Sequence, residues 1–119
     1  MSPTIVLKNG EPIISVGAAG GPKIVSQVIF HLVNMLDLGM SPAESMSLPR
    51  VHHQWSPNTL LVEETLPSEM KTALAGRGHK LGELTPAAVG VSQIVARSPD
   101  RKKFLGAADP RVSGKAAGW

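Results

Sequence analysis

Apolar positions along the chain form one long periodic segment and several short continuous runs. In residues 23–38 they recur every three to four positions, at Ile24, Val28 and Leu32 among others, which predicts an amphipathic helix. Gly39 is placed to end this helix in the left-handed conformation. It is the most regular element that the sequence predicts.

Two hairpins are predicted at the two ends of the chain. Residues 4–7 and 12–16 are runs rich in β-branched residues, and Asn9-Gly10 between them is the strongest local signal for a tight hairpin. Because both runs are apolar at nearly every position, we expect central strands that are covered on both faces. The second hairpin is predicted over residues 91–96 and 104–108, with its turn around Ser98-Pro99-Asp100.

Three shorter elements lie between the hairpins. Ser41, Pro42 and Glu44 form a capping box with proline at the first helical position, which predicts a short helix that Leu48-Pro49 ends. Residues 60–63 predict an edge strand. Pro67 predicts the start of another helix, with Met70, Ala73 and Leu74 on its buried face and Gly76 and Gly78 at its end. The mixture of hairpins and helices indicates an α+β fold, and a length of 119 residues predicts a single domain over residues 1–119.

A glycine-rich turn, Gly17-Ala18-Ala19-Gly20-Gly21-Pro22, connects the second strand to the long helix. A strand, a glycine turn and a helix start together suit an anion, because unpaired backbone N–H groups and the positive end of the helix dipole meet there. Pro22 fits at or near the first helical position, where its missing N–H costs nothing. The spacing of nucleotide-binding glycine loops is absent, so nucleotide binding is not supported. Paired glycines also serve simply as tight turns, so both interpretations stay open at this point.

Composition excludes several classes of function. The net charge of +3 is scattered along the chain, apart from Arg101-Lys102-Lys103, which we expect at a solvated hairpin tip. With two Phe, two Trp and no Tyr, few rings can stack on bases, so we expect no nucleic-acid partner. The absence of cysteine excludes disulfides and a thiol nucleophile. We also expect no signal peptide and no membrane span, because the longest apolar segment is amphipathic.

Other candidate residues favour structural roles. Neighbouring side chains such as those of His52 and His53 diverge, and no carboxylate lies nearby in sequence, so we expect no metal site and instead a polar corner with Arg50 and Trp55. A single histidine on a helix, such as His31, is typical of a surface or hydrogen-bonded core position. Asp109-Pro110-Arg111 offers a carboxylate and a cation that pair with each other or bind a substrate carboxylate, and we favour the structural pairing.

Four motifs together resemble one known family in their order and spacing. The motifs are Met1-Ser2-Pro3-Thr4-Ile5-Val6, Gly20-Gly21 before a basic residue and a long helix, Pro49-Arg50-Val51-His52-His53-Gln54-Trp55, and Gly106-Ala107-Ala108-Asp109-Pro110-Arg111. With them the chain is similar, over nearly all its length, to the C-terminal part of the small subunit of the gamma-glutamyltransferases, also called gamma-glutamyltranspeptidases or glutathione hydrolases. The resemblance implies the N-terminal-nucleophile hydrolase fold, a four-layer αββα sandwich of which this chain is the C-terminal part.

The resemblance also implies a chemistry. Enzymes of this family pass the gamma-glutamyl group of compounds such as glutathione to water or to amino acids, using an N-terminal threonine nucleophile and no cofactor. Gly20 and Gly21 match the family's paired glycines, whose backbone N–H groups form the oxyanion hole and so contact the substrate. The usual family sequence there is Ser-Pro-Gly-Gly-Ser-Arg. Pro22 stands at the second serine and removes one backbone donor.

The family's nucleophile has no counterpart among these residues. Thr4 follows Pro3 inside a predicted strand, and the serine pair that contacts the substrate carboxylate in the family precedes the Met1 motif. We therefore expect the chain to be inactive alone and to associate with the missing upstream part of the enzyme or with itself. The alternatives are a stand-alone binding or structural domain derived from the family, and an unrelated α+β domain with an anion-binding turn. Members of the family are often periplasmic or extracellular, and the localisation of this chain stays open.

Overall fold

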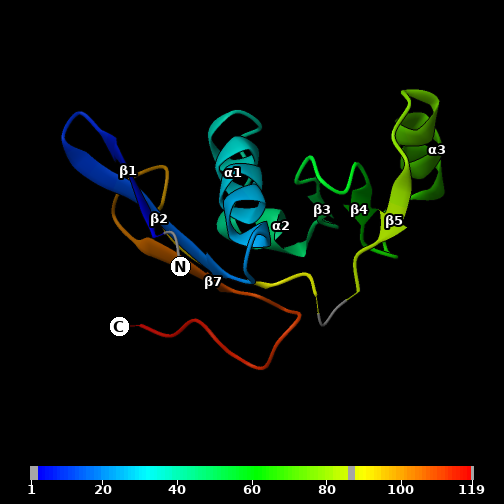
Figure 1. Ribbon diagram of the computed structural model, residues 1–119. Helices are drawn as coiled ribbons and strands as arrows, with labels where there is room; N and C mark the ends of the chain where they lie inside the picture. Colours follow the sequence, from blue (N-terminus) through cyan, green and yellow to red (C-terminus); the bar gives the residue numbers. More distant parts are fainter. Residues whose placement is uncertain (1–2, 86–87, 119) are drawn as a thin grey trace.

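The computed structural model describes residues 3–85 and 88–118, so Met1 and Ser2 of the first motif lie outside the described residues. The described residues form two β-sheets and three helices, as the α+β prediction requires. Figure 1 shows α1 and α2 between the two sheets, with α3 beyond the smaller sheet. The elements in chain order are β1 (Thr4–Lys8), β2 (Glu11–Ala19), α1 (Lys23–Leu36), α2 (Pro42–Ser47), β3 (Val51–His52), β4 (Leu60–Val62), α3 (Ser68–Gly76), β5 (Leu81–Glu83), β6 (Val91–Arg97) and β7 (Phe104–Ala108).

The larger sheet has four antiparallel strands in the order β1-β2-β6-β7 and contains both predicted hairpins. Asn9 and Gly10 have φ angles of 56° and 80°, which are the positive values that a two-residue hairpin turn requires at both central positions. In the second hairpin, Arg101 at the tip has a φ of 60° and is exposed with its two lysine neighbours. The β2–β6 pairing joins the two hairpins into one sheet, with Val16 opposite Ile94.

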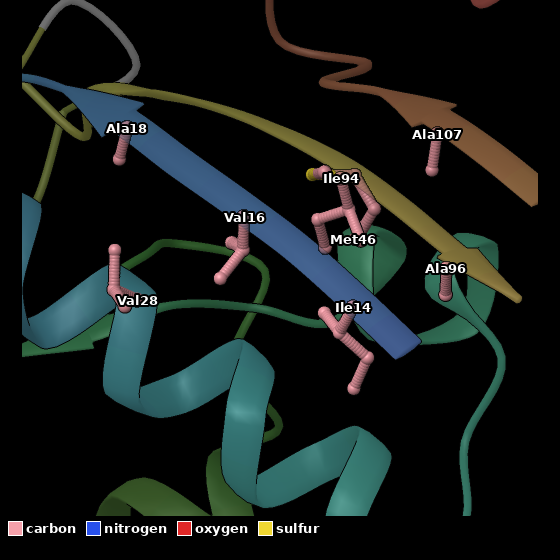
Figure 2. Close-up of a cluster of buried hydrophobic side chains, with 8 residues drawn as sticks. All are labelled: Ile14, Val16, Ala18, Val28, Met46, Ile94, Ala96 and Ala107. Carbon is pink, nitrogen blue, oxygen red and sulfur yellow. The ribbon is translucent and has the colours of Figure 1, made fainter. Parts of the chain in front are cut away.

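The main core lies between this sheet and the first two helices. Alternate residues of β2 point to that side because strand side chains have a period of two. Figure 2 shows side chains from three strands gathered with one residue each from α1 and α2. The cluster is aliphatic and consists of Ile14, Val16, Ala18, Val28, Met46, Ile94, Ala96 and Ala107.

The opposite face of the larger sheet is open except where the C-terminal segment lies against Gly106, which contradicts the prediction of strands covered on both faces. β1 is an edge strand, and the outward side chains of Ile5, Val95 and Phe104 are 63%, 45% and 69% exposed. The strands do carry apolar residues on this face, but no helix or second sheet among the described residues packs against them. The guanidinium of Arg97 lies over the Phe104 ring, 5.4 Å from its centroid, and covers part of this surface.

The first two helices have the ends that the sequence predicts, with small shifts. Helix α1 ends at Leu36, two residues before the expected Leu38, and Gly39 follows with a φ of 69°. Helix α2 begins with the predicted capping box, in which Ser41 and Glu44 exchange backbone and side-chain hydrogen bonds. Pro22 occupies the cap position just before α1.

The smaller sheet was only partly predicted. Strand β4 is its central strand, between antiparallel β3 and parallel β5, so the expected edge position was wrong. Helix α3 packs only lightly: Met70 is 50% exposed, Ala73 is also exposed, and Leu74 alone of the three expected residues packs against the small core. Short strands such as β3 and β5 carry little periodicity, which is why the sequence pattern did not reveal them. Among the described residues, none of the helices has the length and apolar character that crossing a bilayer requires.

Candidate functional site

The glycine turn lies where the sequence predicted it, between the end of β2 and the start of α1. Gly20 and Gly21 are exposed and have φ angles of 138° and 61°, values that residues with a Cβ rarely adopt. Within the described residues the structure gives no hydrogen-bond acceptor for the backbone N–H of either glycine. Their carbonyl oxygens instead accept from Lys23 N–H at 3.3 Å and Ile24 N–H at 3.1 Å, which closes the first turn of the helix. Two backbone donors therefore remain available at the positive end of a 14-residue helix.

The turn touches a second glycine from a distant segment. A Cβ built on Gly20 would lie 2.8 Å from the Cα of Gly90, which is closer than real side chains approach. Gly90 itself has a φ of 83° and immediately precedes β6. The backbone of the turn is thus in direct contact with the backbone of Gly90, and this contact requires glycine at both positions.

Beneath the turn lies a buried ion pair. The Arg50 guanidinium is 2.7 Å from the Asp109 carboxylate, and the two side chains are 2% and 0% exposed. Arg50 Nη1 also donates to Gln27 Oε1 at 2.9 Å, and the Ser92 backbone N–H donates to Asp109 at 2.9 Å. Burial alone would raise the pKa of Asp109, but hydrogen bonds from the backbone of Ser92 and Arg111 and from Arg50 outweigh burial and hold that pKa below its ordinary value.

A second pair extends this network toward β4. Arg111 contacts Glu63 with two bonds of 2.6 Å, from Nε and Nη2 to the two carboxylate oxygens. Arg111 also donates to the backbone carbonyls of Met46 and Leu48, at 3.1 and 3.0 Å. The hydrogen bonds that Arg111 donates to Glu63 raise the pKa of the guanidinium despite its partial burial. Arg111 lies 3.3 Å from Asp109 as well, so both residues hold elements together, as the structural interpretation of Asp109-Pro110-Arg111 expects.

Three of the four histidines occupy different environments. His31 is fully buried, and its Nδ1 lies 2.8 Å from the Ser45 hydroxyl. Burial and then the nearby Arg50 charge lower the pKa of His31 from 6.5 to about 4. His52 is buried against Ser26, with 2.8 Å between its Nδ1 and the hydroxyl oxygen, whereas exposed His53 contacts Asn58. No group of three potential metal-ligating side chains occurs in the part of the chain that the structure describes.

The predicted polar corner is only partly present. His52 and His53 do tie the loop after β3, through Gln54 and Asn58, but the other two expected members point elsewhere. Arg50 turns into the interior toward Asp109, and Trp55 is 84% exposed. Sequence reasoning missed the buried roles of Gln27, Arg50 and Ser92. One signal was present, because Gln27 falls on the same face of α1 as the apolar residues that pack on the sheet.

Comparisons with known proteins give the same family that the four sequence motifs resemble. A family model described as gamma-glutamyltranspeptidase matches residues 1–119. The glutathione hydrolase proenzyme of Escherichia coli strain K12 is 38% identical over 111 residues, covering 93% of this chain and 19% of that protein. The chain therefore spans about a fifth of the length of this curated relative.

Solved structures agree in fold. The T380A mutant of Helicobacter pylori gamma-glutamyltranspeptidase superposes with a TM-score of 0.85 at 36% identity, covering 94% of this chain and 61% of that chain. A cephalosporin acylase from Bacillus halodurans gives a TM-score of 0.88 at 31% identity, covering 98% of this chain and 22% of that one. The predicted fold, the C-terminal part of an N-terminal-nucleophile hydrolase, is confirmed. With a family model that covers its whole length, this chain belongs to the gamma-glutamyltranspeptidase family.

Proposed function

We propose that this chain is the C-terminal part of the small subunit of a gamma-glutamyltransferase, a single unit over residues 1–119, and that Gly20 and Gly21 form its oxyanion hole. The observation that carries the proposal is the pair of exposed backbone N–H groups without an acceptor at the start of α1, in a chain of this family. Its substrates would be gamma-glutamyl compounds such as glutathione.

The chemistry assigned to the turn is electrostatic. When a nucleophile attacks a gamma-glutamyl carbonyl, negative charge develops on the carbonyl oxygen, and two fixed donors with a helix dipole behind them stabilise it. The N–H groups of Lys23 and Ile24 are already engaged and Pro22 has none, so the hole would consist of two donors only. Thr4 lies within β1, so the nucleophile would come from the family's N-terminal threonine, which lies outside these residues.

A hybrid enzyme tests the assignment. The matching 111-residue segment of the Escherichia coli glutathione hydrolase proenzyme would be replaced by this chain, and hydrolysis of a gamma-glutamyl anilide would be measured. Substituting Gly21→Pro removes one donor and should lower kcat by on the order of 100-fold. The 119 residues alone should show no turnover, because they supply a hole without its nucleophile.

The matched control is Gly39→Pro at the other end of the same helix. Gly39 has a φ of 69°, close to the 61° of Gly21, and neither glycine has an atom within 4 Å of a built Cβ, so proline strains both turns similarly. The control should therefore retain activity close to that of the hybrid. Equal losses of kcat in the two variants would refute the oxyanion role. Gly20 and Gly21 would then serve only to form a tight turn.

The open face of the larger sheet supports the proposed partner. The exposed apolar side chains of Ile5, Val95 and Phe104 gather on this face, and the curated relatives are several times longer than this chain. We expect the isolated chain to self-associate through this face, with a mass by light scattering that rises with protein concentration. Val95→Lys should reduce the association, whereas Val25→Lys, at an exposed position on α1, should leave it unchanged. A monomeric chain at high concentration would contradict this expectation.

A further inference from the structure

The side chain of Gln27 is a buried amide whose two ends both make hydrogen bonds. Its Oε1 accepts from Arg50 Nη1 at 2.9 Å and from the Ser92 hydroxyl at 2.5 Å, and its Nε2 donates to the Val89 carbonyl at 2.7 Å. Because one end faces donors and the other faces a carbonyl, the orientation of the amide is determined. Gln27 thereby links α1 to the residue before β3, to β6 and to the segment that precedes β6.

The same amide lies directly beneath the contact between the two glycine segments. A Cβ built on Gly90 would lie 2.3 Å from Gln27 Nε2 and 2.5 Å from the Ala19 carbonyl oxygen. A Cβ built on Gly20 would lie 3.6 Å from Nε2. Gln27 therefore packs against Gly90 and Gly20 at once, and its bond to Val89 holds the segment on which the turn rests.

The helix holds the turn only through the glycine carbonyls. The two bonds that α1 makes to the turn, from Lys23 and Ile24, measure 3.3 and 3.1 Å, and Pro22 contributes no donor. The directions of the Gly20 and Gly21 N–H groups therefore also depend on the support from below, which is the amide of Gln27 and the Gly90 backbone.

We infer that Gln27 is a positioning residue for the oxyanion turn, which it couples to the buried Arg50–Asp109 pair. The inference rests on the proposed function of Gly20 and Gly21, but Gln27 itself touches neither substrate nor the reacting atoms. Its amide fixes the position and orientation of the turn through its contacts with Val89 and Gly90. An oxyanion hole tolerates little displacement, since an error of about 1 Å in position can cost on the order of 100-fold in rate.

The test substitutes Gln27→Met, which keeps the length of the side chain and removes all three hydrogen bonds. In the isolated chain, the amide resonances of Gly20, Gly21 and Gly90 should shift, and their N–H groups should exchange faster with solvent. In the hybrid enzyme, kcat should fall about 10- to 100-fold while KM changes less than about threefold, because ground-state binding does not depend on the hole.

Asn34→Leu provides the matched control. Asn34 is another buried amide on α1, 5% exposed, but its side chain donates to the Ser45 hydroxyl, away from the glycine turn. This variant should lose stability as well, yet leave the Gly20 and Gly21 resonances and kcat unchanged. Ser92→Ala is a milder second variant, because it removes one bond to Oε1 and keeps the bond from Nε2 to Val89. Its kcat should fall less than that of Gln27→Met.

Two results would overturn the inference. Either Gln27→Met leaves the glycine resonances and kcat unchanged, or Asn34→Leu lowers kcat by the same factor, which would mean a general loss of stability. If Gly21→Pro leaves the hybrid active, the oxyanion assignment itself fails, and that outcome is separate from any result at Gln27. The amide resonances of Gly20, Gly21 and Gly90, measured in the isolated chain, test the positioning role even if a hybrid variant does not fold.

Discussion

Replacing Asp109 by asparagine is expected to lower the free energy of unfolding by about 3–5 kcal/mol. The carboxylate is the charged partner of Arg50, and both side chains are excluded from water. Asparagine keeps the shape and can still accept from the Ser92 N–H, but it leaves the Arg50 guanidinium buried without the carboxylate that pairs with it directly. Urea denaturation, followed by circular dichroism at pH 7 and low protein concentration, measures the loss.

Glu11→Gln is the matched control for this variant. It also neutralises the partner of an arginine, but the Arg97–Glu11 pair is 3.8 Å long, with side chains 29% and 56% exposed. Exposed pairs contribute about 0–1 kcal/mol, so this change should be small. Adding Arg50→Met to Asp109→Asn removes the unpaired charge, and the double variant should be more stable than the single one. A loss of unfolding free energy as small as that of the control would show that the ion pair does not hold the segments around Arg50 and Asp109 together.

Acidification from pH 7 to pH 4 is expected to cost about 3 kcal/mol of stability through His31 alone. Burial and the Arg50 charge lower the pKa of His31 from 6.5 to about 4, so the folded state resists a proton that the unfolded state accepts. The stabilisation is complete above pH 6.5 and is lost as the pH falls toward 4. The pKa values of Asp109 and Glu63 are lowered too, so the contributions of these carboxylates begin to be lost as the pH falls through the ordinary range of carboxyl groups, and they are fully lost only below the lowered pKa values.

Substituting His31→Gln isolates the effect. Glutamine can still hydrogen-bond the Ser45 hydroxyl but does not titrate, so the dependence of stability on pH between 6.5 and 4 should flatten. His53→Gln, at an exposed position, should retain the dependence of the parent chain. The charged groups around His31 are Arg50, Asp109 and Arg111, and none of them changes in either variant. An unchanged slope in His31→Gln would assign the acid sensitivity to other groups.

The open sheet face shows how a correct pattern led to a wrong local expectation. The apolar residues of β1 and β2 predict burial on both faces, but the partner for one face is not among the described residues. Similarly, the apolar run of β4 predicted a strand but not its position, because its neighbours β3 and β5 are too short to leave a periodic signal. Strand order depends on pairing between distant segments, which periodicity does not encode.

The sequence by itself determined the features that depend on neighbours along the chain. Asn9-Gly10 specifies its hairpin through positive φ angles, Ser41 and Glu44 specify the start of α2 through the capping box, and Gly20-Gly21 marks the turn before α1. Only the tertiary structure decided what supports that turn. Gln27 and Ser92 are 65 positions apart, yet their side chains bond beneath it. A buried polar group is stable only when folding brings its partners to it, so such a network becomes visible only once the two hairpins and α1 have packed together.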